Sequence, residues 1–159
     1  MGAYRDSGST HTITFSNYFV NDNQVQGTKT VSNTGRNTGG NLVFSIVENG
    51  SVTQPGGGTI TRSSNRFREW FAGESTPIWN DDIYLLTGNA NGTNADGDAF
   101  TSSITTALRK EIGCRNVVSG VLEFTPASRP TRTIDFGNGT CDNTATVTVN
   151  GRSRTITLP

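Results

Sequence analysis

Hydrophobic and polar residues alternate with a period of two along almost the whole chain, which is the pattern of half-buried β-strands. Many of these runs place Thr beside Val, Ile or Phe, residues that favour extended structure. We expect strands at His11–Val20, Gln24–Ser32, Leu42–Val47, Ser51–Val52, Thr59–Arg62, Arg66–Phe71, Asp82–Thr87, Phe100–Thr106, Val117–Phe124, Thr131–Phe136, Thr144–Val149 and Ser153–Leu158.

Turn signals separate these runs. Asn49-Gly50 and Asn150-Gly151 are typical of two-residue hairpins, and Pro55–Gly58 predicts a further turn. We expect residues Gly88–Ala99 to form a longer loop between two strands. Only Ile104–Ile112 also fits helical spacing; we favour a strand there, followed by a turn over Leu108–Gly113.

About eleven short strands with frequent turns predict an all-β fold, either an antiparallel sandwich or a long twisted meander. No linker or change of composition divides the chain, so we expect residues 1–159 to form a single β-rich domain. The chain contains no apolar run of the roughly 20 residues that a membrane helix needs. It opens on polar sequence without a signal peptide, and we expect it to be the C-terminal part of a longer exported protein.

The composition is polar but not strongly charged. Hydrophobic residues make up 31% of the chain and charged residues 16%, against about 25% charged residues in average globular domains. Because the formal net charge is zero, nothing indicates a nucleic-acid partner. The pairs Arg66/Arg68 and Arg152/Arg154 each place two cations on one strand face, which fits a solvated face or contact with an anion or polysaccharide.

The chain has two cysteines, Cys114 and Cys141, and neither belongs to a Cys-x-x-Cys pair. We expect a disulfide between them, which indicates an oxidising compartment outside the cytoplasm. The alternative is a pair of buried free thiols in a reducing compartment.

Oxygen-bearing side chains gather in one glycine-rich loop: Asp135, Asn138, Asp142 and Asn143. Gly137 and Gly139 let the backbone curl, so these residues form a candidate calcium site. Turns in which Asp and Asn side chains bond the loop backbone explain the same residues without a metal. No other cofactor is expected. A second acidic loop, Asn94 to Asp98, is better explained by solvated turn residues.

Trp70, Trp79 and Tyr84 are candidate ligand-binding residues, because neighbouring aromatic rings can form a platform for sugars; core packing is the alternative. The chain carries none of the familiar catalytic motifs, and its single histidine, His11, favours no catalytic relay. The carboxylates Glu69 and Glu123 could form a glycosidase pair, although salt bridges to arginine explain them equally well. We expect no enzymatic activity.

One segment carries a family resemblance. The tail Ile134–Gly151, with Asp135-Phe136-Gly137-Asn138-Gly139 leading to Cys141-Asp142-Asn143, resembles the C-terminal signature of uncharacterised Bacteroidetes lipoproteins and secreted proteins. Segments Thr12–Tyr18, Val25–Asn33 and Asp82–Gly88 are similar too. In that family an acidic residue usually stands at position 138 and a tyrosine at position 136. The resemblance implies export and a β-rich fold, and it implies no reaction.

Three functions follow as hypotheses. The first is a structural or adhesive protein, extracellular or on the outer surface of a bacterium, whose exposed edge strands pair with further copies of itself. The second is a carbohydrate-binding module that uses Trp70 or Trp79, and its partner would be a surface polysaccharide. The third is a small glycosidase-like enzyme.

Overall fold

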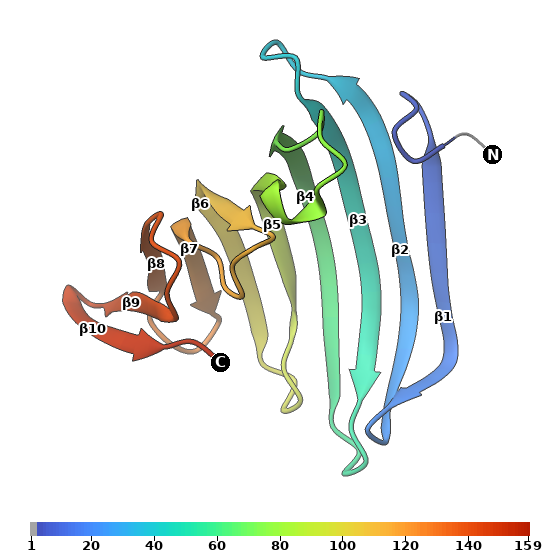
Figure 1. Ribbon diagram of the computed structural model, residues 1–159. Coiled ribbons are helices and arrows are strands. Elements are labelled where there is room, and N and C mark those ends of the chain that lie inside the picture. Colours follow the sequence, from blue (N-terminus) through green and yellow to red (C-terminus); the bar gives the residue numbers. More distant parts are fainter. Residues whose placement is uncertain (1–2) are drawn as a thin grey trace.

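The computed structural model describes residues 3–159, which form one antiparallel sheet of ten strands (Figure 1). Each strand pairs with the next along the chain, so the topology is a simple meander. The strands are β1 (Thr10–Val20), β2 (Asn23–Arg36), β3 (Leu42–Thr53), β4 (Thr59–Ala72), β5 (Ile83–Thr93), β6 (Ala99–Glu111), β7 (Ser119–Pro126), β8 (Arg132–Asn138), β9 (Thr144–Val149) and β10 (Arg152–Thr157). In this described part of the chain one 3₁₀ turn, η1 (Trp79–Asp81), lies between β4 and β5.

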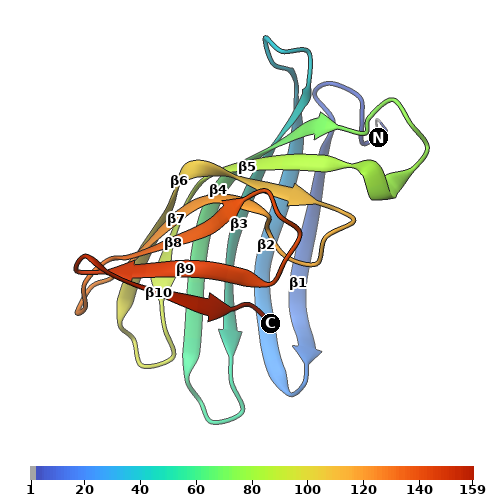
Figure 2. The same ribbon diagram turned by 60° about the vertical axis from the view of Figure 1, so that its left-hand side comes forward.

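The meander confirms one of the two architectures expected from the sequence. The described residues form a single sheet rather than a sandwich, and the sheet curls strongly, as Figure 2 shows. Strands β1 and β10 are its two edges and lie at opposite sides of Figure 1.

Several predicted strand boundaries are wrong, because the central strands are longer than the sequence suggested. Asn49-Gly50 is no hairpin but lies inside β3, where Asn49 is opposite both Thr28 and Ser63. Pairing on both sides satisfies the backbone groups that a turn would leave open. In the same way β4 runs without a break, and β5 continues through the first half of the predicted loop Gly88–Ala99, to Thr93. Strand β6 continues past Leu108 to Glu111, where the sequence predicted a turn.

Residues opposite each other on neighbouring strands share a face, and the core lies on one face only, here called the inner face. Its central cluster is Leu42, Phe44 and Trp70, with Val31 and Tyr84 packed against it. Phe44 has no exposed surface. A single open sheet can bury side chains on one face when it curls toward that face, and Figure 2 shows the curl of this sheet.

Glycines permit the curl where neighbouring backbones approach closely. A Cβ atom on Gly88, whose φ is +118°, would overlap the backbone oxygen of Asn65 and lie 2.7 Å from the Cα atom of Arg66. Gly27, with a φ of +131°, faces the backbone of Asn49 in the same way. Such positions mark a bend in a sheet, and they require glycine.

The opposite, outer face is polar and rich in hydroxyl groups. Cross-strand hydroxyl pairs bond at 2.8–3.2 Å in six places: Thr10–Ser32, Thr12–Thr30, Thr53–Thr59, Thr61–Thr93, Thr125–Thr131 and Thr148–Ser153. Each pair contributes a few tenths of a kcal/mol, on the order of 0.2–1. The alternation of threonine along the sequence therefore reflects a solvated face held in register by hydroxyl pairs.

Candidate functional site

The edge strand β1 exposes much of its apolar surface. Four of its residues are large and exposed: Ile13 (50%), Tyr18 (49%), Phe19 (58%) and Val20 (44%). None of its eleven residues is a lysine, an arginine or a carboxylate. An edge strand presents a row of unpaired backbone groups, so β1 is a surface on which another strand can pair.

One protective feature interrupts β1. A bulge shifts the register between Phe15 and Tyr18, and Asn17 has a φ of 51°. Bulges bend an edge strand and limit pairing beyond them. The regular run from Thr10 to Phe15 is therefore the part of β1 best suited to accept a partner strand.

The other edge, β10, differs from β1 in length and charge. It has six residues, and two of them are Arg152 and Arg154. Both arginines share the inner face, because they lie opposite Val149 and Val147 of β9. A short strand with charges on its inner face is a common protection against pairing between edges. The two edges of the sheet are thus unequal, and β1 is the open one.

The proposed aromatic platform does not exist as one surface. Trp70 is buried (7% exposed) and belongs to the core, while Trp79 in η1 is 71% exposed. The Trp70 indole N–H donates a hydrogen bond to Asp82 (3.0 Å), and the Tyr84 hydroxyl donates to the other oxygen of the same carboxylate (3.0 Å). Tyr84 and Trp70 therefore position a buried carboxylate, and only Trp79 offers a free ring to a ligand.

Burial and the hydrogen bond to Asp82 raise the pKa of Tyr84 to about 12. The folded protein then keeps this proton between about pH 10 and 12, where the unfolded chain loses it, so the free energy of unfolding falls as the pH rises through that window. We expect Tyr84→Phe to remove this part of the alkaline destabilisation. Denaturant unfolding of both proteins below and above about pH 10 measures it, with equal pH dependence as the contradicting result.

The predicted calcium loop is organised by its own hydrogen bonds. Asp135 accepts from the backbone of Gly137 (2.8 Å), and Asn138 accepts from the hydroxyl of Thr140 (2.9 Å). Asp142 accepts from both the backbone (2.8 Å) and the hydroxyl (2.9 Å) of Thr144. These are the local turns that the sequence offered as the alternative to a metal. Calcium binding by Asp135, Asn138, Asp142 and Asn143 stays a prediction.

The two cysteines meet as expected. Cys114, in the loop after β6, and Cys141, in the loop after β8, form a disulfide with their Cα atoms 5.7 Å apart. Lys110 secures the first loop, because its ammonium group donates to the backbone oxygens of Cys114 and Arg115. The disulfide therefore ties together the strand ends on either side of β7.

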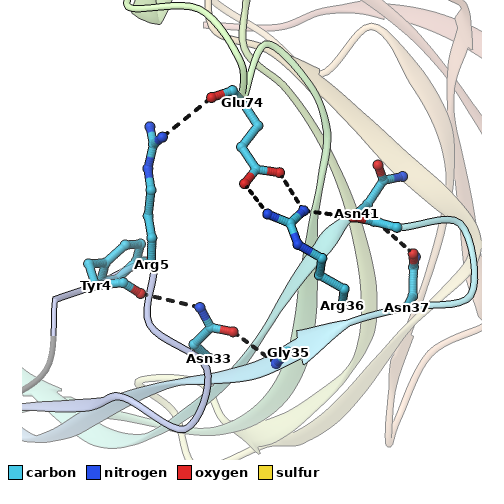
Figure 3. A network of polar contacts seen from close by, with 9 residues as sticks. Tyr4, Arg5, Asn33, Gly35, Arg36, Asn37, Asn41 and Glu74 are labelled. Carbon is cyan, nitrogen blue, oxygen red and sulfur yellow. Dashed lines mark hydrogen bonds and ion pairs between the residues drawn. The ribbon is translucent and has the colours of Figure 1, made fainter.

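A polar network fixes the N-terminal segment against the sheet (Figure 3). Arg36 forms two hydrogen bonds with the Glu74 carboxylate (2.7 and 2.9 Å), which hold the pKa of Glu74 below its usual value. Arg5 donates to the backbone oxygen of Glu74 (3.3 Å), and its guanidinium lies over the Trp70 ring, 4.3 Å from the centroid. The loop after β4, the end of β2 and the N-terminal segment thus close over the core together.

The sequence did not reveal how the arginines would be used. Arg68 lies over the rings of Phe44 and Tyr84, about 5 Å from each centroid, and it donates to the Tyr4 hydroxyl. Tyr4 itself stacks on Phe44 at 4.8 Å. The alternation Arg66-x-Arg68-x-Trp70 was the available signal, since it puts these residues on the aromatic face of the sheet.

The two carboxylates considered for glycoside hydrolysis lie far apart. Glu69 is on β4 and Glu123 on β7, both on the outer face, and three strand spacings separate them by roughly 14 Å or more. A glycosidase pair stands about 5–10 Å apart. Glu69 instead accepts a hydrogen bond from Asn41 (2.7 Å).

Comparison of the chain with protein families, with curated proteins and with solved structures finds no match in any of the three. Within residues 3–159 no helix is long and apolar enough to cross a membrane. The fold and the site define a protein with one curled antiparallel meander. One disulfide links two of its loops, and β1 is an edge strand that can accept a partner strand.

Proposed function

We propose that this protein is a non-enzymatic structural or adhesive module, extracellular or on the outer surface of a bacterium, that associates with further copies of itself through β1. The observation that carries the proposal is the contrast between the two edges. Strand β1 has eleven residues and no formally charged side chain at neutral pH, whereas β10 has six residues and two arginines. Addition of a strand to an open edge gains backbone hydrogen bonds without a preformed pocket.

The disulfide supports a location outside the cytoplasm. A disulfide persists in oxidising compartments, and closing the 27-residue separation between Cys114 and Cys141 stabilises a chain whose hydrophobic fraction is only 31%. The family resemblance of Ile134–Gly151 points to export as well, and lipoprotein-like surface attachment belongs to the same proposal.

The unequal edges favour a closed dimer rather than a fibre. Two β1 strands can pair antiparallel about a twofold axis, and such an isologous contact uses up both open edges. Pairing of β10 with β10 would bring Arg152 and Arg154 close to the same arginines of the second copy, and like charges at that distance destabilise a strand pair.

A lysine on β1 tests this pairing. Thr14→Lys adds a charge on the exposed outer face of β1, and the same charge appears twice across a twofold pair. We expect the association constant to fall about tenfold, because a lysine on an edge strand opposes pairing and the two added lysines repel each other across the twofold axis. Sedimentation velocity over a concentration series measures the constant.

The control is Thr155→Lys, an exposed threonine on the outer face of β10. It should leave the association unchanged. Pairing through β1 would be contradicted by a wild-type protein that stays monomeric at every concentration. It would also be contradicted if Thr14→Lys and Thr155→Lys lowered the association constant equally.

Carbohydrate binding is the second candidate, and one observation favours it. Trp79 is 71% exposed, beside Ile78 at 58%, on the loop between β4 and β5. An exposed indole can stack on a sugar ring. A glycan array on wild type and Trp79→Ala tests this function: binding that the variant loses supports it, and an array without binding removes it.

A further inference from the structure

A groove of about 390 Å³ lies on the inner face, near the turns that join β1 to β2 and β3 to β4. Its apolar walls are Phe15, Val25, Val52 and Ile60. Pairing puts three of them in a row, because Val25 is opposite Val52 and Val52 is opposite Ile60. The volume falls in the range of about 300–1,000 Å³ that small-molecule sites occupy.

The floor of the groove is bare backbone. Gly27 and Gly50 are opposite each other on β2 and β3, and both line the groove. A Cβ atom on Gly27 would overlap the backbone of Asn49, and one on Gly50 would lie 2.7 Å from the backbone oxygen of Gln26. The sheet thus requires glycine at both positions, and the hollow follows from the missing side chains.

One end of the groove carries more cations than carboxylates. Lys29, Glu48 and Arg62 line it, and Glu48 is paired with both Lys29 (3.0 Å) and Arg66 (2.6 Å). Burial alone would raise the pKa of Glu48, but the hydrogen bond from Lys29 and the nearby charges of Arg66, Lys29 and Arg62 lower it. Arg62 forms no ion pair within residues 3–159. Three cations therefore share one ionised carboxylate.

A smaller hollow of about 130 Å³ adjoins this end, with Arg62 and Arg66 in its wall. Within residues 3–159, two buried polar groups close by lack a hydrogen-bond partner: the hydroxyl of Ser64, a residue only 3% exposed, and the Nε of Arg66. Unsatisfied buried donors are rare in folded proteins and are costly. Both would gain from an acceptor such as a carboxylate oxygen.

We propose that the groove binds a single-chain carboxylate amphiphile, a fatty acid, with its alkyl chain over Gly27 and Gly50 and its carboxylate between Lys29 and Arg62. The apolar walls provide contact for methylene groups, and the excess of cations selects an acid over a neutral molecule of the same length. Free fatty acid is the occupant, rather than a membrane or a second copy of the chain. This site does not depend on pairing through β1.

Displacement of a fluorescent fatty acid by laurate and by dodecanol tests the site in the full chain. We expect saturable binding, and at least tenfold stronger displacement by laurate because only the acid meets the cations. Affinity should also rise with each methylene in a series of shorter acids, by up to about fourfold. Absence of saturable binding, or equal displacement by acid and alcohol, would overturn the proposal.

Matched variants locate the site. Arg62→Gln should weaken the binding of laurate about tenfold and leave the binding of dodecanol unchanged. Arg154 lies on the same inner face but on β10, and Arg154→Gln should change the affinity for neither ligand. Loss of laurate binding in both variants would show that the cations of the whole inner face attract the carboxylate, and it would overturn the assignment to the groove. Sedimentation of the protein with phosphatidylglycerol vesicles but no laurate binding would overturn it in favour of a membrane surface. Dimers that Ile60→Asp dissociates, again without laurate binding, would overturn it in favour of a second copy.

Discussion

Gly88→Ala is expected to lower the free energy of unfolding by roughly 3–5 kcal/mol, a large share of the total stability of a domain of this size. Two effects combine. The φ of +118° is strained for any residue with a side chain, and the new methyl group would press on the backbone of Asn65 and Arg66 in β4. Because the close approach of β4 and β5 bends the sheet, relaxation would flatten the curl and loosen the core at Trp70. Urea unfolding monitored by tryptophan fluorescence measures the change.

Gly56→Ala is the matched control. Gly56 lies in the turn between β3 and β4, its φ is outside the left-handed region, and a Cβ atom there meets nothing within 4 Å. We expect a change within about 0.5 kcal/mol, because alanine fits a compatible backbone and restricts the unfolded chain slightly. Equal destabilisation by both substitutions would mean that the approach of β4 and β5 does not decide the curvature.

Removal of the disulfide has the second large effect. We expect the double substitution Cys114→Ser/Cys141→Ser to cost about 3–4 kcal/mol, because the unfolded chain gains the freedom of a loop whose ends are 27 residues apart in sequence. Without the disulfide, β7, β8 and β9 should unfold first, because they contribute few buried side chains. Urea unfolding and hydrogen exchange of these strands measure it.

The disulfide between Cys114 and Cys141 should be present in the protein as it is purified without reductant. Its intact mass without reductant should be lower than the reduced mass by two hydrogen atoms. Two free thiols in freshly purified protein from an oxidising compartment would contradict the disulfide, and they would remove the main support for a location outside the cytoplasm.

Much of the fold follows from the period-two pattern, because alternation reports directly on which strand face is buried. Strand β9 and the hairpin at Asn150-Gly151 lie where the pattern placed them. The prediction of a hairpin at Asn49-Gly50 was wrong. An Asn-Gly dipeptide is typical of hairpin turns, but it also suits a strand in which the glycine lies against a neighbouring backbone. Local sequence cannot separate the two cases, because the difference lies in the strands on either side.

The sites were harder to anticipate. The loop from Asp135 to Asn143 shows which residues gather, but hydrogen bonds to Gly137 and Thr144 depend on backbone angles that composition does not give. The groove depends on Gly27, Gly50 and Arg62 lying opposite one another across three strands, which requires the pairing register. The absence of charge on β1 is different: it can be read from Thr10–Val20 directly, and only its position at the edge had to come from the structure.

The open edge without formal charge and the groove with a glycine floor have one common cause. A polar chain with few apolar residues builds a single curved sheet, and that sheet leaves one edge and part of its inner face without a covering layer. Pairing through β1 uses the backbone edge of that strand, whereas ligand binding uses the inner face over Gly27 and Gly50, with Phe15 contributing to both. Substitutions at Thr14 and at Arg62 therefore test the two proposals separately.

Hydrogen exchange as a function of protein concentration tests the central claim about β1 most directly. At low concentration the outward-facing amides of Thr10–Phe15 should exchange quickly, since an edge strand leaves them unpaired. At high concentration these amides should become protected, while those of Arg152–Thr157 in β10 keep their rate. Exchange in Thr10–Phe15 that is independent of concentration, or new protection in β10 instead, would contradict association through β1.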